Sequence, residues 1–300
     1  MKAGPGKSAL LLGAMLASAV LASGCDQDGT PGKLAESRGD PVLSEPASAS
    51  PPPLVLSPVP TAVPALDDAD ETASELVAAE LAIRAESTPP DAMGRLGRIQ
   101  QAAYRKLVAN PPWRAAAFSK APAALEEVVR SNIIAGEELR ALTKPATTLP
   151  PWKIVAPPPA DELRRYYAEA GDRFGIRWAY LAAIHLVESR MGRIRGTSSA
   201  GAQGPMQFIP STWARYGEGD INNPRDAITA AARYLKAAGA PGDMDRALYA
   251  YNHSDRYVRA INIYAGQMLG NERTYLAFYH WQVYVRTVNG DVLLEVGYGA

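Results

Sequence analysis

Glu188, in the stretch AIHLVESRMG, is the side chain whose setting most favours chemistry. Residues 178–189 are apolar almost all round a helical projection, which predicts a buried central helix. A carboxylate near the C-terminal end of such a helix loses hydration and also meets the negative end of the helix dipole. Both effects raise its pKa. A carboxyl group with a raised pKa can protonate a glycosidic oxygen near neutral pH.

Two other interpretations of this helix stay open on the sequence alone. Glu188 could form an ordinary surface ion pair with Arg190 or Arg193, because most perturbed acids are structural. His185 lies three residues before Glu188 and could tune it, although a satisfied core histidine is the commoner role for such a residue.

The uncharged segment 201–213, GAQGPMQFIPSTW, is a second feature with chemical potential. Its glycines, Gly201 and Gly204, allow a backbone to approach a ligand closely. Gln207 offers both a donor and an acceptor to hydroxyl or acetamido groups. Apolar surface for the C–H face of a sugar is expected from Met206, Phe208 and Trp213, with core packing as the alternative for the two aromatic residues.

Three short blocks of sequence carry a family resemblance: Glu188-Ser189-Arg190, residues 198–208, and Ala250-Tyr251-Asn252. Their order and spacing resemble those of the soluble lytic transglycosylase family of peptidoglycan-cleaving enzymes, whose catalytic domain has a goose-type lysozyme fold. The similarity covers about residues 161–270. The flanking helices and the C-terminal end resemble extended secreted actinobacterial members of the family.

The resemblance implies that Glu188 is a single catalytic acid and base. It implies that the enzyme cleaves the β-1,4 bond between N-acetylmuramic acid and N-acetylglucosamine, with formation of a 1,6-anhydro sugar. The substrate-binding residues that it implies are Ser198, Met206, Gln207, Tyr251 and Asn252. Two departures from the family pattern are His253-Ser254 after the last motif and one additional residue between Glu188 and Gln207. The alternatives are a hydrolytic muramidase and a non-catalytic peptidoglycan-binding protein.

A second carboxylate would favour the hydrolytic alternative. Glycosidases that use two carboxylates need the second about 5 to 9.5 Å from the acid. The candidates are Glu218, Asp220 and Asp226, and no motif selects one of them. The loop from Asp220 resembles a calcium loop only faintly, because it lacks the central glycine and has Ala231 at its twelfth position. We therefore expect no metal and no other cofactor.

The periodicity of apolar residues predicts the elements that position these side chains. Helices are expected from about Thr72, over 96–107, over 125–133, and at 162–173 with Asp161 as N-cap and Gly175 as the stop. Further helices are expected at 178–189, 226–238, 244–251 and 254–268. A proline-rich stretch, 145–159, containing Trp152, is expected to be a boundary or a strap on the next domain. Alternation after Trp281 and the Asn289-Gly290 pair predict a β-hairpin.

The predicted fold is therefore mainly α: a lysozyme-like helical domain with a short C-terminal β-hairpin, preceded by extra helices and a disordered tether. The predicted organisation is a signal peptide (1–24), a lipidated Cys25 with a proline-rich linker (25–71), a helical N-terminal segment (72–150) and a catalytic domain (151–300).

The N-terminal sequence predicts export and membrane attachment. Lys2 and Lys7 precede an apolar run that is too short to span a bilayer comfortably. The run ends in Leu21-Ala-Ser-Gly-Cys25, which resembles a bacterial lipobox and implies lipid on Cys25, the single cysteine of the chain. An ordinary signal peptide with an incidental cysteine is the alternative. The expected location is extracytoplasmic, anchored by lipid to the cell membrane.

Charge composition limits the expected partners. Lys plus Arg and Asp plus Glu are both 31, so the formal net charge is zero and nothing favours nucleic acid. The expected partners are peptidoglycan glycan strands and, through the lipid, the membrane. We expect a monomer.

Overall fold

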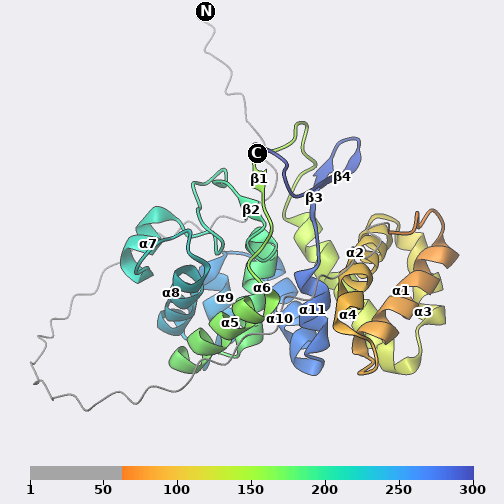
Figure 1. Ribbon diagram of the computed structural model, residues 1–300, viewed down its shortest axis with the longest axis horizontal. Coiled ribbons are helices and arrows are strands. Elements are labelled where there is room, and N and C mark those ends of the chain that lie inside the picture. Colours follow the sequence, from red (N-terminus) through yellow and green to blue (C-terminus); the bar gives the residue numbers. More distant parts are fainter. Residues whose placement is uncertain (1–62) are drawn as a thin grey trace, which may run out of the picture.

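The computed structural model describes residues 63–300, and the expected signal peptide, Cys25 and most of the expected linker lie outside the described residues. The described part is mainly helical, as predicted (Figure 1). The helices of its N-terminal part are α1 (Ala69–Arg84), α2 (Met93–Ala109), α3 (Arg114–Lys120) and α4 (Ala123–Ala141). Short 3-10 turns precede α2 and α3, at Pro90–Ala92 and Pro111–Trp113.

The start of the folded chain differs from the prediction. The linker was expected to reach residue 71, but Leu66 is buried in the core and α1 begins at Ala69. Asp68 is the N-cap of α1, and its side chain accepts a hydrogen bond of 2.8 Å from the Glu71 backbone N–H. This cap satisfies one of the free donors of the first turn, which is why the helix starts before Thr72.

The C-terminal part carries the helices expected to hold the site. They are α5 (Ala160–Phe174), α6 (Trp178–Ser189), α7 (Pro210–Tyr216), α8 (Pro224–Ala238), α9 (Met244–Tyr251), α10 (Asp255–Gly270) and α11 (Arg273–Tyr279). The bounds of α6 and α9 match the prediction. The sequence reading missed α3, α7 and α11, which are single short helices of seven residues each.

Two predicted helix starts, of α5 and α8, are each two residues too late, for the same physical reason. Asp161 lies in the first turn of α5 rather than at its N-cap, which is Pro159. Asp226 lies in the first turn of α8, because the Asn223 side chain caps that helix by accepting from the backbone N–H groups of Arg225 and Asp226. Acidic residues are also favourable inside a first turn, so they do not mark the cap uniquely.

The N-terminal helices α1–α4 and the C-terminal helices α5–α11 share one hydrophobic core. Buried residues from Leu66 to Trp281 form a continuous cluster, with α4 packed along α10 and α2 against α11. In Figure 1, α1–α4 lie at one end of the long axis and α5, α7 and α8 at the other, with α6, α10 and α11 between them. Residues 69–141 are therefore an integral wall of the structure around the site.

The proline-rich stretch 145–159 is a strap, which was one of the two structures predicted for it. Trp152 is buried in a second small core with Ile154, Ile194 and the hairpin. Within the strap, β1 (Lys153–Ile154) pairs antiparallel with β2 (Ile194–Arg195), a pairing that the sequence did not reveal. Because β2 follows α6 closely, the strap holds the chain just beyond Glu188.

The C-terminal hairpin is confirmed, with β3 (Val283–Thr287) paired antiparallel to β4 (Gly290–Leu294). Its turn differs in detail from the prediction. Val288 and Asn289 are the central residues, and Gly290 follows at a φ of 114°, where only glycine fits readily. The hairpin lies on the same edge of the molecule as β1 and β2 (Figure 1).

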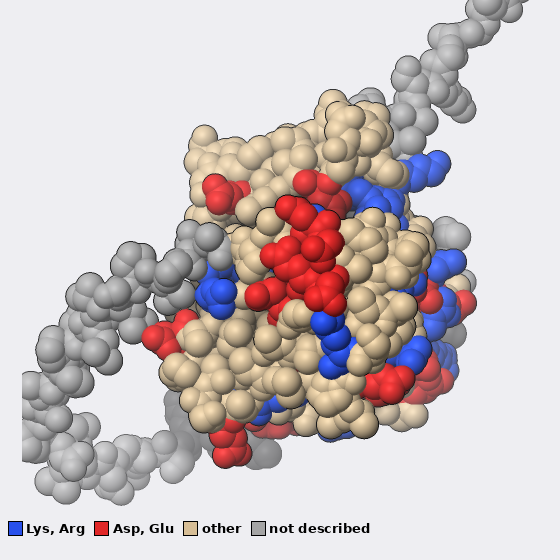
Figure 2. All heavy atoms as spheres, turned by 90° about the vertical axis from the view of Figure 1, so that its right-hand side faces the viewer, with Lys and Arg blue, Asp and Glu red and all other residues tan. Residues whose placement is uncertain are grey.

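Acidic side chains gather at the end of the molecule where α1 lies, as the space-filling view of that face shows (Figure 2). Exposed acids around the start of α1 are Asp67, Asp68, Asp70 and Glu71. Lys120 pairs with Asp70 at 2.8 Å, and the positive N-terminal end of α1 favours the rest.

Among residues 63–300, no helix combines the length and the apolar character needed to cross a membrane.

Candidate active site

Glu188 lies in the last turn of α6, buried to 3% exposure, as the apolar sequence around it predicted. Immediately after the helix, Arg190, Met191 and Gly192 have φ values of 54°, 59° and 83°. Three successive left-handed residues turn the chain sharply, and two of them are not glycine, which is uncommon. The helix end is thereby fixed in a conformation that the surrounding structure must maintain.

The end of α6 is tied directly to the segment 201–208. The Ser189 hydroxyl donates to the Pro205 carbonyl at 2.5 Å and accepts from the Gly192 N–H at 3.1 Å. The two stretches that carry the sequence motifs therefore meet in space, and a side chain of the Glu-Ser-Arg block joins them.

The carboxyl group of Glu188 has a single hydrogen-bond donor among the described residues. Tyr257, on α10, donates to Oε1 at 2.9 Å, while Oε2 is buried and has no partner there. Burial raises the pKa of Glu188 to about 8, and the Tyr257 hydrogen bond opposes this only in part. At neutral pH the carboxyl group therefore keeps a proton that it can donate.

The ion-pair interpretation of Glu188 is not what the structure shows. The Arg190 guanidinium donates to the Leu186 carbonyl at 2.7 Å, and the Arg193 guanidinium donates to the Arg190 carbonyl at 3.1 Å. Across residues 63–300, no Lys or Arg lies within ion-pair distance of Glu188.

His185 is a core histidine. It has no exposed surface, and its Nδ1 shares a hydrogen bond of 2.6 Å with the Tyr167 hydroxyl. Burial, together with the nearby Arg195 and Arg193, lowers its pKa to about 3, so the ring is neutral at physiological pH. Its partner is Tyr167 rather than Glu188, which favours the structural interpretation over a tuning role.

Gln207 is held by its own loop with one acceptor left free. Its Nε2 donates to the Gly204 carbonyl at 2.8 Å, and its Oε1 is buried without a partner in the described structure. Its φ of 51° is strained for a glutamine. Gln207 therefore presents an oriented, unsatisfied acceptor, and the Glu188 carboxyl group likewise has an oxygen, Oε2, without a partner among the described residues.

Ser198 and Asn252 also keep hydrogen-bonding capacity. The Ser198 hydroxyl oxygen accepts from the backbone N–H groups of Ala202 and Ala200, at 2.9 and 3.3 Å, so its proton remains to be donated. Asn252 directly follows α9, is 6% exposed, and its side-chain amide makes no hydrogen bond within residues 63–300.

Tyr251 links the site residues instead of pointing a free hydroxyl outward. Its hydroxyl donates to the Met206 carbonyl at 2.7 Å, next to Gln207. Its ring lies parallel to that of Tyr257, with centroids 6.5 Å apart and 3° between the planes. Glu188, Tyr257, Tyr251 and the Met206–Gln207 backbone thus form one connected series.

The expected apolar surface for a sugar is largely absent from segment 201–213, so that expectation is wrong for Met206 and Phe208. The Met206 side chain has no exposed surface and Phe208 has 3%, so both are core residues behind the loop. Trp213 is half-buried against the Phe208 ring, with centroids 5.6 Å apart. The apolar character of these three side chains is therefore explained by packing within the protein.

The role of Gly204 also differs from the expectation. At its φ of 72°, a Cβ atom would lie 2.0 Å from the Ile221 carbonyl oxygen. Glycine is required there by the close approach of another backbone segment, not of a sugar. Gly201, with a φ of 85°, has open space around its Cα, as a ligand-facing glycine requires.

Two of the three candidates for a second carboxylate, Glu218 and Asp220, lie in the connection between α7 and α8, and Asp226 lies in the first turn of α8. Glu218 pairs with Arg233 at 2.9 Å, Asp226 Oδ2 accepts from the Asp220 N–H at 3.0 Å, and Asp220 Oδ1 accepts from the Asn222 N–H at 2.9 Å. Glu218 and Asp226 line a separate pocket with Glu169 and Arg233 that does not include Glu188.

Tyr257 is the site residue that sequence reasoning missed. It lies in the first turn of α10, six residues after Tyr251, and its side chain is fully buried. The one available signal was an aromatic residue with a hydroxyl on the apolar stripe of a predicted helix. Such a position is read as core packing unless the partner is known.

The fold and the site define a mainly helical, lysozyme-like domain with one buried, protonated carboxyl group and several unsatisfied polar groups nearby. A family model described as the transglycosylase SLT domain matches residues 165–271, which contain Glu188 and every predicted substrate-binding residue. The match implies activity of the lytic transglycosylase type, connected with peptidoglycan. No curated protein and no solved structure matched the chain.

Proposed function

We propose that the protein is a peptidoglycan lytic transglycosylase that cleaves between N-acetylmuramic acid and N-acetylglucosamine and forms 1,6-anhydromuramic acid. The observation that carries the proposal is the state of Glu188: buried, with a pKa raised to about 8, and with Oε2 left without a hydrogen-bond partner among the described residues. Such a group is an acid at the start of a reaction and becomes a base once it has lost its proton.

In the proposed reaction, Glu188 donates its proton to the glycosidic oxygen as the bond to C1 of muramic acid breaks. The neighbouring N-acetyl oxygen stabilises the positive charge that develops on the sugar. Glu188, now ionised, then takes the proton of the C6 hydroxyl, and that oxygen closes onto C1. The proton count balances, water is not consumed, and Glu188 returns to its protonated state.

The surrounding residues have separate roles in this proposal. Tyr257 orients the carboxyl group through Oε1, which leaves Oε2 toward the leaving oxygen. Ser198, Gln207 and Asn252 are proposed to bind the sugar, because each keeps a free donor or acceptor. Tyr251 acts as a positioning residue through its bond to the Met206 carbonyl, and Met206 contributes that backbone contact.

A muramidase would use the same acid but would let water attack C1, and a wall-binding protein would not turn over at all. Digestion of purified peptidoglycan in heavy-oxygen water separates the three. We expect anhydro-muropeptides without label, because the C6 hydroxyl attacks C1. Labelled reducing ends would favour the muramidase, and intact glycan would favour the binding protein.

We further propose that the protein is anchored outside the cytoplasm by lipid on Cys25. The basis is the position of the single cysteine directly after the apolar N-terminal run. Cys25→Ser should leave the membrane fraction or remain uncleaved. A processed Cys25→Ser protein that still sediments with membranes would contradict this proposal.

A further inference from the structure

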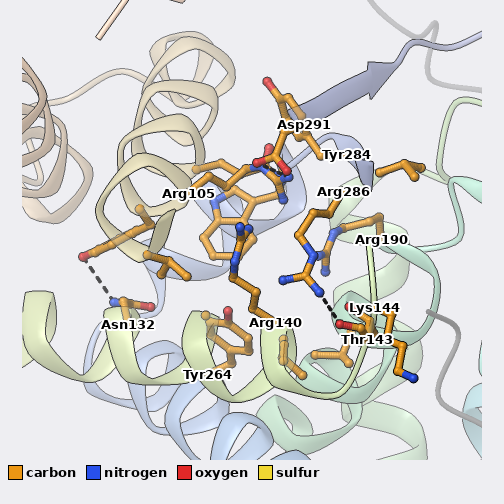
Figure 3. Close-up of a pocket in the computed structure, with 18 of the residues that line it drawn as sticks. Arg105, Asn132, Arg140, Thr143, Lys144, Arg190, Tyr264, Tyr284, Arg286 and Asp291 are labelled. Atoms are coloured by element: carbon orange, nitrogen blue, oxygen red, sulfur yellow. Dashed lines mark hydrogen bonds and ion pairs between the residues drawn. The ribbon is translucent and has the colours of Figure 1, made fainter. Parts of the chain in front are cut away.

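A large pocket lies beside the end of α6, on the side formed by the N-terminal helices and the C-terminal hairpin (Figure 3). Its walls come from α2, α4, α10, the hairpin and the strap, and its space, including the open mouth, is about 1170 Å³. All but three of its lining residues lie outside residues 165–271, the part matched by the family. We call it the basic pocket.

The basic pocket concentrates positive charge. Its lining includes Arg105, Arg140, Lys144, Arg190 and Arg286, against a single carboxylate, Asp291. Asp291 pairs with Arg105 at 2.6 Å, which leaves the other four cations without a carboxylate partner within residues 63–300. In Figure 3, the side chains of Arg105, Arg140, Arg190 and Arg286 converge on one space, whereas Lys144 extends away from it.

Several of these guanidinium groups are poorly satisfied. Arg286 donates to the Thr143 carbonyl, but its Nε is buried without a partner in the described structure. The Arg140 side chain makes no hydrogen bond or ion pair within residues 63–300. Burial lowers the pKa of Arg286, and the positive charges of Arg140 and Arg105 lower it further. Like charges held together in a partly desolvated space are unfavourable unless an anion joins them.

The position of the basic pocket relates it to the reaction. Val187 and Arg190, the residues on either side of Glu188-Ser189, both line it. The last turn of α6 therefore carries the catalytic carboxyl group and also contributes to the wall of the pocket. A substituent carried by a glycan strand bound at Glu188 would lie near the pocket, while the sugar backbone itself has too few charges to match it.

The walls narrow the choice of ligand further. Between the arginines they present apolar and aromatic groups, including Val108, Leu139, Tyr264 and Trp281. A peptide with free carboxylates matches this mixture, since arginine binds carboxylates in a planar, two-point geometry and the apolar groups accept aliphatic side chains. Muramic acid carries such a peptide on its lactyl group.

We propose that the basic pocket binds the carboxylate-bearing peptide stem attached to muramic acid. This proposal rests on the proposed transglycosylase function for its link to turnover, but the binding itself can be measured without catalysis. The extra helices α2 and α4 and the hairpin then have a purpose: they extend the catalytic domain toward the peptide.

The test uses the full chain and two probes from one amidase digestion of peptidoglycan: the free peptide, and the glycan strands stripped of peptide. Calorimetric titration with the free peptide should show binding that weakens with added salt. Arg140→Gln should weaken it about tenfold or more, as expected for a lost hydrogen bond to a charged group. Arg130→Gln, on an exposed part of α4 where Arg130 pairs with Glu126, is the matched control and should bind normally.

Turnover on the two kinds of strand gives the second measurement. Arg140→Gln should raise KM about tenfold on strands that carry peptide and leave KM unchanged on stripped strands. Equal behaviour on both strands, or a wild-type protein that does not bind the peptide, would overturn the pocket assignment while leaving anhydro-sugar formation intact. Binding of inorganic phosphate in place of the peptide would overturn it in favour of a phosphate site. If the peptide binds but no anhydro product forms, the proposed function fails and the pocket stands.

Discussion

Glu80 and Glu188 are both buried glutamates, and their surroundings are opposite. Glu80, on α1, has no exposed surface and three partners: an ion pair with Arg84 and hydrogen bonds from Gln100 at 3.1 Å and from the Tyr104 hydroxyl. Glu188 is 3% exposed and has one partner, Tyr257, with one oxygen unsatisfied.

The difference separates a carboxyl group with several partners from a carboxyl group with a single donor. The partners of Glu80 belong to α1 and α2, and Arg84 donates a further hydrogen bond of 3.0 Å to Gln267 on α10, so the network ties the N-terminal helices to α10. A fully satisfied buried charge holds elements in place. Glu188 lacks such partners, and the resulting raised pKa leaves it a proton to give.

The largest effect is expected from Glu188→Gln. The amide keeps the shape and the Tyr257 contact but cannot donate a proton, so turnover of peptidoglycan should fall by at least ~10³. Circular dichroism should show an intact fold. Near-normal turnover by this variant would remove the distinction between the two glutamates and the catalytic assignment with it.

Glu80→Gln should give the reverse pattern, with stability lost and chemistry kept. Removing one partner of a buried ion pair leaves Arg84 uncompensated, and we expect the free energy of unfolding to fall by about 3 kcal/mol. Turnover per folded molecule should be unchanged. Glu75→Gln is the matched control on the same helix, because Glu75 makes no hydrogen bond or ion pair within residues 63–300; it should change stability by less than ~0.5 kcal/mol. Denaturant titration measures both.

The pH dependence of stability should also distinguish Glu188. Its folded pKa is raised to about 8 from an ordinary value of 4.5. Between these values the folded protein keeps a proton that the unfolded chain releases, so stability falls as pH rises and levels off above about 8. Relative to Glu188→Gln, the wild type should lose roughly 2 kcal/mol between pH 5 and pH 7. A constant difference over this range would mean that Glu188 titrates normally.

The sequence revealed the catalytic region better than the network around Glu80. The apolar helix 178–189 and the position of Glu188 near its end were enough to predict burial and a raised pKa, because both depend on local sequence. A helix from about Thr72 was predicted, but Glu80, on the buried side of that helix, was not singled out. Its partners Gln100 and Tyr104 lie on another helix, and a single sequence does not show which helices meet.

The segment 201–208 also shows a limit of what a single sequence can predict. Its composition marked it as a feature with chemical potential, and the contact between Ser189 and Pro205 brings it to the end of the helix that carries Glu188. Which side chains face the core was not predictable, because an irregular backbone has no period. Met206 and Phe208 turned inward, and Gln207 lies between them at a positive φ.

The smallest expected effect concerns the one partner that Glu188 has. The Tyr257 hydroxyl donates to the carboxyl group and lowers its pKa, against the larger effect of burial. Tyr257→Phe should therefore raise the pKa of Glu188, and the pH above which turnover declines should move upward by about one unit, the worth of one such hydrogen bond. Below that pH, Glu188 stays protonated and turnover should change little.

Tyr251→Phe is the control for Tyr257→Phe, because its hydroxyl contacts the Met206 carbonyl rather than Glu188. It should reduce turnover by loosening the segment that holds Gln207, without moving the pH at which turnover declines. The measurement is kcat as a function of pH for the wild type and both variants. If the two variants shift the pH limit equally, Tyr257 acts on the fold of the site in general. The hydrogen bond from Tyr257 would then have no specific effect on the pKa of Glu188.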